Sequence, residues 1–298
     1  MWFKNLMIYR LPAPWAITAK QLDAQLATQF FTPCSSAENQ SQGWDAPRGE
    51  SLVHTVNGQF LINLATEKKL LPASVINQVA KARAAEIEEH QGFKPGRKLL
   101  KEIKEQVTED LITKAFSIKS NTHVWIDPKN GWLCIDTSSP SKSDDVLKML
   151  LKTISAFPVE MLRVMRSPVS AMTDWLAGNE APIGFTIDQD TELRSSAQSK
   201  ATVRYVRHTL DPKEISGHIA SGKQCTKLAM TWRDKISFVL TESLTVRRIQ
   251  PLNVLIEKQE AQEDDQFDSD FALMCGELNN FFADLVTALS VEKNEQSA

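Results

Sequence analysis

Residues 200–250 read KATVRYVRHTLDPKEISGHIASGKQCTKLAMTWRDKISFVLTESLTVRRIQ. Interleaved apolar and polar side chains in this stretch predict strands over 201–210, 224–232, 236–241 and 243–250. We expect the last three to be successive antiparallel strands, so the stretch makes this part of the chain a sheet. It also holds ten Lys or Arg against four acidic residues, a net charge of +6. We call this stretch the basic block.

The chain as a whole hides this charge asymmetry. Its formal net charge is −3, yet the residues before the basic block are neutral overall and residues 251–298 carry a net −9. A basic segment of this kind favours a polyanionic partner, which the total charge does not suggest. The alternative is that these cations form the solvated outer face of a sheet, and composition alone leaves both interpretations open.

Bulk composition indicates an ordinary globular protein. At 298 residues, with 42% hydrophobic and 24% charged residues, the chain can bury a full core in two or three subdomains. No apolar run approaches the roughly 18 residues of a membrane span, and the N-terminus lacks a signal-peptide pattern. The four cysteines show no CxxC spacing, so we expect reduced, partly buried thiols and a cytoplasmic protein with no membrane contact.

Residues 1–166 predict an α+β unit interrupted by two helices. Asn-Gly at 57–58 and at 130–131, each between apolar strand patterns, predicts two β-hairpins. The expected elements are a strand over 2–11 covered on both faces, a helix after the capping box of Thr18 and Gln21 with Leu22, Leu26 and Phe30 on one stripe, a loop over 33–51, hairpins over 52–65 and 122–136, a helix over 142–155 and a strand over 159–165.

Helical periodicity over about 74–91 and 97–114 predicts a helical hairpin that projects from the sheet. We therefore divide the chain into a central α+β domain (1–72 with 117–166), a helical hairpin insertion (73–116) and a second α+β domain (167–298). Lysines crowd one end of the hairpin, and Lys98 and Lys101 are candidates for a nucleic-acid contact. The competing interpretation is a solvated helix face that pairs with nearby glutamates.

The second half of the chain continues the α+β pattern. A helix is expected up to Gly178, a strand over 184–189, and a short helix that Asp211 caps and Gly222 ends. Residues 257–270 look like an acidic linker. The final helix carries a stripe of large apolar residues, typical of a core or of a dimer interface: Phe271, Met274, Leu278, Phe281 and Leu285.

The sequence carries no convincing catalytic motif. Residues 217–224 nearly match a phosphate-binding loop, but Gln224 replaces the required Ser or Thr, and the local order is helix, turn, strand instead of strand, loop, helix. The histidines lack metal-ligand spacing. The acidic pairs at 188 and 190 and at 268 and 270 could serve a two-metal nuclease, but no acid-rich motif supports them. We predict no catalytic residue, no metal and no cofactor.

Short segments along the whole chain, in matching order, resemble the RdgC family of recombination-associated proteins of proteobacteria. These segments are WFKNLMIYRL (2–11), FTPC (31–34), VNGQ (56–59), KLLPASVI (69–76), AFS (115–117), WID with NG (125–131), TDW (173–175), GF (184–185), GKQCTKLAMTW (222–232) and DFALMCGEL (270–278).

The resemblance implies a non-enzymatic, nucleoid-associated protein that binds DNA with little sequence preference and restrains the RecA recombinase, in part by competing for DNA. It implies a horseshoe-like monomer and a ring-shaped homodimer, whose basic central hole admits duplex DNA; single-stranded DNA is a second candidate ligand. It also implies that Phe116 is exposed for pairing at a gate between the two copies.

The family's basic position before the short helix falls on Arg207, and the next position is His208, where we expect Gln. Arg204 and Arg207 are expected on opposite faces of one strand, so only one of them lines the hole, and we favour Arg207. The other DNA-binding candidates are Lys200, Lys223, Lys227, Arg233, Lys235, Arg247 and Arg248. Two alternative functions stay open: a regulator that contacts recombination proteins through 257–270 and the final helix, and a metal-dependent nuclease.

Overall fold

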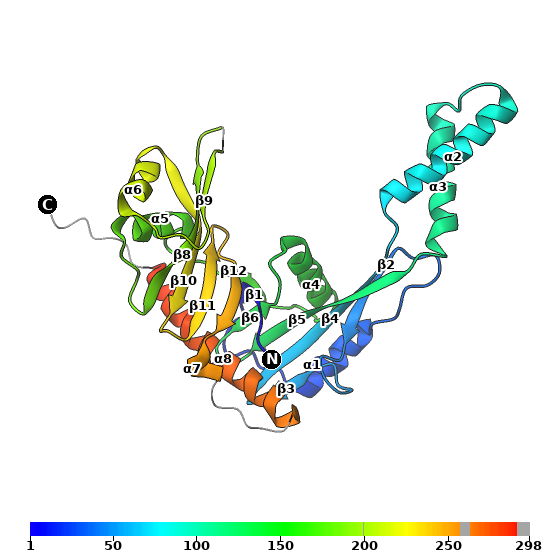
Figure 1. The fold of residues 1–298 in the computed structure, drawn as a ribbon. Helices are drawn as coiled ribbons and strands as arrows, with labels where there is room; N and C mark the ends of the chain where they lie inside the picture. Colours follow the sequence, from blue (N-terminus) through cyan, green and yellow to red (C-terminus); the bar gives the residue numbers. More distant parts are fainter. Residues whose placement is uncertain (199, 257–262, 291–298) are drawn as a thin grey trace.

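The computed structural model describes residues 1–198, 200–256 and 263–290 as an α+β fold built on one long antiparallel sheet (Figure 1). The strands are β1 (Asn5–Arg10), β2 (Gln40–Asp45), β3 (His54–Val56), β4 (Gln59–Lys69), β5 (Ser117–Asp127), β6 (Trp132–Ile135), β7 (Glu160–Met161), β8 (Phe185–Ser195), β9 (Thr202–Tyr205), β10 (Lys223–Trp232), β11 (Ile236–Thr241) and β12 (Val246–Pro251). Their order in the sheet is β2-β4-β5-β6-β1-β12-β11-β10-β8-β9, with β3 beside β4 and β7 beside β1.

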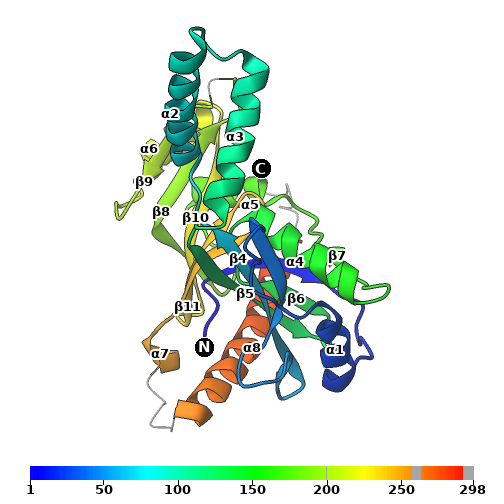
Figure 2. The same cartoon turned by 90° about the vertical axis from the view of Figure 1, so that its right-hand side faces the viewer.

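The helices lie on both faces of this sheet and at its ends. They are α1 (Ala19–Leu26), followed by a 3₁₀ turn over Ala27–Gln29, α2 (Ala73–Gln91), α3 (Arg97–Ile112), α4 (Pro140–Thr153), α5 (Pro168–Gly178), α6 (Pro212–Ala220), α7 (Asn253–Ile256) and α8 (Glu263–Ala288). The predicted hairpin α2–α3 is confirmed and projects from one end of the sheet, whereas α6 and β9 stand at the other end (Figures 1 and 2).

Strand β1 joins the two halves of the sheet. Its first residues pair with β12, so that Asn5 lies opposite Arg247, and its later residues pair with β6, so that Met7 lies opposite Ile135. Leu6 and Tyr9 are both buried, but in hydrophobic clusters on opposite faces. The prediction that this strand is covered on both sides is therefore confirmed, because only apolar residues on both faces satisfy two cores at once.

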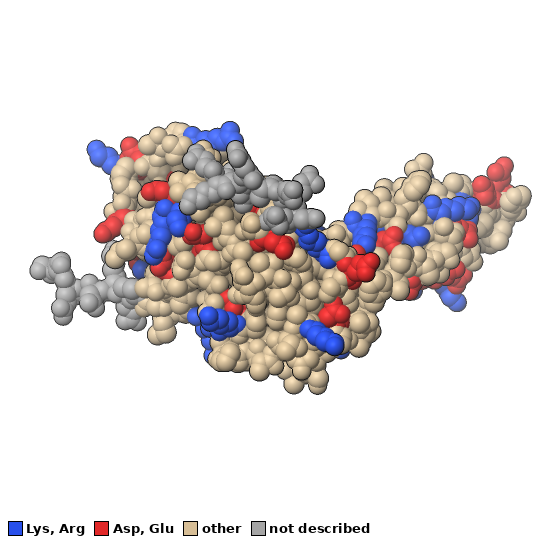
Figure 3. Space-filling model, turned by 90° about the horizontal axis from the view of Figure 1, so that it is seen from below, with Lys and Arg blue, Asp and Glu red and all other residues tan. Residues whose placement is uncertain are grey.

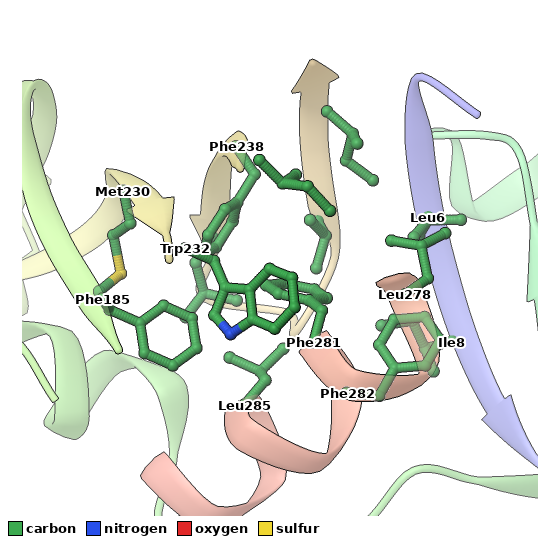
Figure 4. Packing of buried hydrophobic residues seen from close by; sticks show 14 of the residues in the cluster. Leu6, Ile8, Phe185, Met230, Trp232, Phe238, Leu278, Phe281, Phe282 and Leu285 are labelled. Carbon is green, nitrogen blue, oxygen red and sulfur yellow. The ribbon is translucent and has the colours of Figure 1, made fainter. Parts of the chain in front are cut away.

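The largest core lies between the sheet and helix α8. Trp232 and Phe238 of the sheet point toward Phe281 and its neighbours on α8, with ring centroids 5.8 and 4.9 Å from Phe281 (Figure 4). The buried indole N–H of Trp232 donates to Asp284, so the polar atom of this large side chain is satisfied. The apolar stripe of the final helix is thus the chain's own core, and it is not exposed as the partner surface that the protein-contact alternative requires.

Two smaller cores complete the packing. Helices α1 and α4 cover the other face of the sheet over β1 and β4–β6. The hairpin α2–α3 has a separate cluster of its own, formed mainly by Ala80, Ala84, Ile103 and Val107. Beyond α4, on the same side of the sheet, strands β8 and β10–β12 carry polar and partly exposed side chains such as Lys227. We call this side of β8–β12 the open face.

The structure corrects several expected boundaries. Residues 40–45 of the expected loop form strand β2, and Phe30 is 58% exposed instead of lying on the stripe of α1. Strand β9 ends at Tyr205 and β8 runs on to Ser195, while β7 has two residues. The expected acidic linker is helical from Glu263, and residues 257–262 lie outside the described part of the chain.

Local signals at turns and caps are confirmed. Asn57 and Gly58 have positive φ in the β3–β4 turn, as a two-residue hairpin with both central residues left-handed requires. Thr18 and Gln21 form the capping box of α1, and Asp211 caps α6. Gly222, with φ +84, follows Ser221, the C-cap residue of α6, so the apparent phosphate-binding loop is a helix end.

Candidate nucleic-acid interface

The sheet divides the basic block between its two faces. Arg233 and Lys235, beside the β10–β11 turn, form ion pairs of 2.8 and 2.7 Å with Asp284 and Glu277 of α8. These two candidates therefore lie on the side of the large core, away from the open face. Seen from below (Figure 3), the molecule shows separate basic and acidic groups scattered over a mostly uncharged surface, with no broad basic patch in view.

Five other cations of the basic block border two adjoining grooves on the open face, of about 560 and 240 Å³. The grooves share Asp190, Val239 and Arg248 in their walls. The cations are Arg204, Arg207, Lys227, Arg247 and Arg248, and the acids are Asp188, Asp190 and Glu192. The grooves therefore carry an excess of two positive charges. These residues come from separate strands, and only the register of those strands brings them together.

Glu192 of β8 is the centre of the smaller groove. The register sets Arg204 of β9 and Lys227 of β10 directly opposite it on either side. Arg204 Nε donates to Glu192 Oε2 at 2.6 Å and Lys227 Nζ donates to the same oxygen at 2.8 Å, while Thr226 donates to Oε1 at 3.0 Å. The Glu192 side chain is 9% exposed, so this row of charges is partly shielded from water.

The electrostatics of Glu192 follow from these contacts. Burial alone would raise the pKa of Glu192, but hydrogen bonds from Lys227, Arg204 and Thr226 outweigh burial and lower the pKa to about 2. Glu192 is therefore a carboxylate at neutral pH and neutralises one of its two cations. Among the residues that the structure describes, Arg204 is bound only through Nε, and its side chain is 66% exposed.

The larger groove is organised by Asp190. Its Oδ1 accepts a hydrogen bond of 2.7 Å from the backbone N–H of Arg207, and its Oδ2 lies 3.6 Å from Arg248 Nη1. Arg207 and Arg248 both have left-handed backbones, with φ of 50° and 52°. Arg248 lies where the β11–β12 register shifts, and such bulges re-aim side chains.

The expectation that Arg204 and Arg207 occupy opposite faces of one strand is wrong. Strand β9 ends at Tyr205, so the alternation of a strand does not extend to Arg207. Both arginines border the grooves of the open face instead. The choice between them that the sequence suggested is therefore unnecessary.

The remaining basic candidates are more scattered. Lys200 is exposed in the β8–β9 connection, Lys223 donates to Ser221, and the His208 ring lies 2.8 Å from the Thr209 carbonyl oxygen. Arg247, one of the five groove cations, also donates to the carbonyl of Ser138, next to the start of α4. Lys98 and Lys101 are exposed on α3, far from the open face, and Lys101 lies 3.6 Å from Glu105 as the solvated-helix alternative predicts.

Phe116 lies between α3 and β5 and is 84% exposed. Its carbonyl accepts a hydrogen bond from Leu70 N–H, which fixes the backbone without burying the ring. Leu70 and Ile118 beside it are also exposed. Phe116 is therefore not a core residue of this chain, and its ring is free to contact another surface.

The acidic pairs have partners within the chain. Asp188 accepts from Thr231, and Asp190 holds the Arg207 N–H and Arg248. Asp268 is 2.8 Å from the His54 ring nitrogen. Within residues 1–198, 200–256 and 263–290, no group of three or more His, Cys, Asp or Glu side chains is placed to hold a metal ion.

Sequence reasoning missed Glu192 and the role of Asp190 in the larger groove. The available signal was the run of acids at 188, 190 and 192, which share one face if the segment is a strand. Their pairing with cations of β9, β10 and β12 depends on long-range register.

In the same described ranges, no helix is both long and apolar enough to cross a membrane.

Comparison with known proteins gives consistent matches over the whole chain. A family model described as "Putative exonuclease, RdgC" matches residues 1–292. The chain is 62% identical over 297 residues to the recombination-associated protein RdgC of Janthinobacterium sp. (strain Marseille), covering 98% of this chain and 99% of that protein. It is 61% identical to the protein of that name from Herminiimonas arsenicoxydans and 56% identical to the one from Bordetella pertussis (strain Tohama I), with the same coverage.

Proposed function

Because the chain belongs to the RdgC family of recombination-associated proteins, we propose that it binds duplex DNA through the open face, with little sequence preference and without catalysing a reaction. Occupying DNA in this way antagonises RecA-dependent recombination by competition and makes the protein nucleoid-associated. Single-stranded DNA is a second ligand of the same chemistry, since it offers the same phosphates.

One observation carries this proposal: five cations border adjoining grooves on a polar sheet face, against three carboxylates. Lys and Arg attract phosphates regardless of base sequence, because binding releases the counterions of the DNA. Contacts to phosphate position a protein on DNA, whereas contacts to base edges specify the sequence. A shallow strand face with arginine side chains suits the first kind of contact.

The shape of the chain supports a closed assembly. The hairpin α2–α3 and the α6–β9 end both rise on the side of α4, as a horseshoe-like monomer requires (Figure 1). Asn5 opposite Arg247 places the open face on that same side of the sheet. Two copies that meet at these ends form a ring with the open faces toward its hole, and the exposed Phe116 ring is a contact at one junction.

The description of the family model as a "putative exonuclease" makes nuclease activity the second candidate. The contacts of two groove carboxylates favour DNA binding without cleavage. Asp188 accepts a hydrogen bond from Thr231, and Asp190 contacts Arg207 and Arg248, so both carboxylates already have partners within the chain. Metal-dependent nucleases instead present carboxylates that can share ions.

The test removes equal charge from the two faces. Replacing Arg207 and Arg248 by Ala lowers affinity for unrelated duplexes alike and reduces the slope of log K against log[salt] by about 1 for each phosphate that is no longer neutralised. The matched control replaces Arg233 and Lys235, whose partners are on α8, and leaves the affinity nearly unchanged. Fluorescence anisotropy with labelled duplexes, in Mg²⁺, measures both, and the duplex stays intact.

Equal decreases in affinity from the two double variants would contradict the open face as the DNA surface. Cleavage of the duplex, or binding of the wild type that is insensitive to salt or confined to one sequence, would contradict the proposed function itself.

A further inference from the structure

We infer that Glu192 is a positioning residue that orients Arg204 as a phosphate-binding fork, so that Arg204, Glu192 and Lys227 together form a subsite for one phosphodiester of DNA. The inference rests on the proposed function and names a subsite within the open face. Glu192 touches no phosphate and acts through Arg204.

The geometry of Arg204 leaves part of its guanidinium group available. A guanidinium group has five N–H donors in a rigid plane and binds carboxylates or phosphates with two parallel hydrogen bonds. Arg204 uses Nε for Glu192, at 2.6 Å. Among the described residues, neither terminal nitrogen of Arg204 has a hydrogen-bond partner, and the side chain is largely exposed. The two terminal nitrogens can therefore donate to an outside acceptor.

Glu192 is held rigidly enough to fix Arg204. Its side chain is almost buried and accepts from three donors on two strands, so it has little freedom to move. A long cationic side chain loses rotamer freedom when it binds, and that loss weakens affinity. Because Glu192 holds Arg204 in place beforehand, part of this loss is already incurred in the folded protein.

The charge of Glu192 acts in the opposite direction. A carboxylate near a phosphate repels it, so a Glu192 that only neutralised its neighbours would weaken DNA binding. Arg204 and Lys227 lie on either side of Glu192 and leave the row with one net positive charge. The two interpretations predict opposite changes in affinity when the Glu192 charge is removed, so affinity decides between them.

The experiment is a double-mutant cycle on the full-length protein, with a labelled random-sequence duplex as the probe. Arg204→Ala weakens binding about tenfold, the effect of removing one bidentate phosphate contact. Glu192→Gln weakens it about three- to tenfold although it removes a negative charge. In the Glu192→Gln background, Arg204→Ala costs less than about twofold more, because the contact is already impaired.

The matched control is Glu242→Gln. Glu242, just after β11, pairs with Arg194 of β8, and neither residue borders the two grooves. This variant removes the same charge without freeing a groove cation, so it leaves affinity unchanged or slightly raised. If Glu192→Gln does not fold, judged by circular dichroism, Glu192→Asp keeps the charge, shortens the side chain by one methylene group and is also expected to weaken binding.

Unchanged or raised affinity in the folded Glu192 variant, as in Glu242→Gln, overturns the inference. Additive effects in the cycle overturn it as well, because they mean that Glu192 and Arg204 act independently. Wild-type protein that does not bind duplex DNA in a salt-dependent way overturns the proposed function instead, so the two failures are distinguishable.

Discussion

At the scale of single residues, several cations of the basic block are paired with acids from elsewhere in the chain. Arg204 and Lys227 share Glu192, Arg248 faces Asp190, and on the other side of the sheet α8 supplies acids to Arg233 and Lys235. None of these acids lies within residues 200–250. The net charge of +6 counted along the sequence therefore overstates the positive potential at the protein surface. That potential depends on where the ion pairs leave unneutralised positive charge.

The pKa of Glu192 predicts a pH-dependent contribution to stability. The folded-state pKa of about 2 is below the usual value of 4.5, so the contribution is fully present above 4.5 and is lost as pH falls toward 2. At pH 7, Glu192→Gln lowers the free energy of unfolding by about 1–2 kcal/mol, a figure discounted for the exposure of Arg204 and Lys227. Urea unfolding between pH 7 and pH 3 measures the difference, which shrinks toward the acid end.

The exposed pair of Arg194 and Glu242 gives the comparison, since Glu242→Gln changes stability by less than about 1 kcal/mol. A destabilisation by Glu192→Gln that is the same at pH 3 and pH 7 would show that packing, and not its charge, holds the three strands together.

At the scale of elements, local signals predicted the helices and turns well, and long-range pairing limited the rest. Asn57-Gly58 and the Asp211 cap act through their own neighbours, so a short window of sequence contains the whole cause. Strand β2 was missed because Trp44 is the only large apolar residue in QSQGWD, and because the strand is stabilised by its ladder with β4, a long-range pairing that a local pattern does not reveal.

The candidate site shows the same division more sharply. The sequence named Arg204, Arg207 and Lys227 as basic candidates, but not Glu192, because an acid has no place in a search for cations. The row of Arg204, Glu192 and Lys227 exists only when β9, β8 and β10 pair in one register. The sequence also named Arg233 as a DNA-binding candidate because of its charge. In the structure, Arg233 lies in the turn after β10 and pairs with α8 instead.

The separate core of the α2–α3 hairpin leads to a prediction of local instability. Val107 is fully buried between the two helices, in a cluster whose side chains belong to neither of the sheet cores. Val107→Ala removes two methyl groups there and costs about 1–3 kcal/mol. We expect faster amide hydrogen exchange over 73–112 and unchanged protection in β4 and β5, because opening is confined to the hairpin.

Leu100→Ala on the same helix is the control, since Leu100 is partly exposed and its truncation has a smaller effect on exchange. If Val107→Ala accelerated exchange equally in the sheet, the hairpin would unfold together with the rest of the chain, and its independence would be disproved.

At the scale of the whole molecule, β1 and α8 join segments that are far apart in sequence into one folded unit. Strand β1 hydrogen-bonds to both β12 and β6, and the largest core brings Leu6 and Trp125 together with Phe282 of α8. The open face and the base of the hairpin are therefore held in one continuous sheet. We therefore expect the proposed ring to admit DNA by separation of the contacts between the two copies, more than by a hinge motion within the sheet.

Phe116 tests that assembly. Its ring is 84% exposed, so Phe116→Ala leaves the unfolding free energy of the monomer within about 0.5 kcal/mol of the wild type, unlike truncation of a buried Phe, which costs about 3–5 kcal/mol. If the ring pairs with a second copy, the variant dissociates at higher protein concentration than the wild type in sedimentation velocity. Phe93→Ala, at another exposed phenylalanine of the hairpin, controls for general loss of apolar surface. Equal dissociation of both variants, or none, contradicts a specific junction at Phe116, because a gate requires one ring to carry most of the contact.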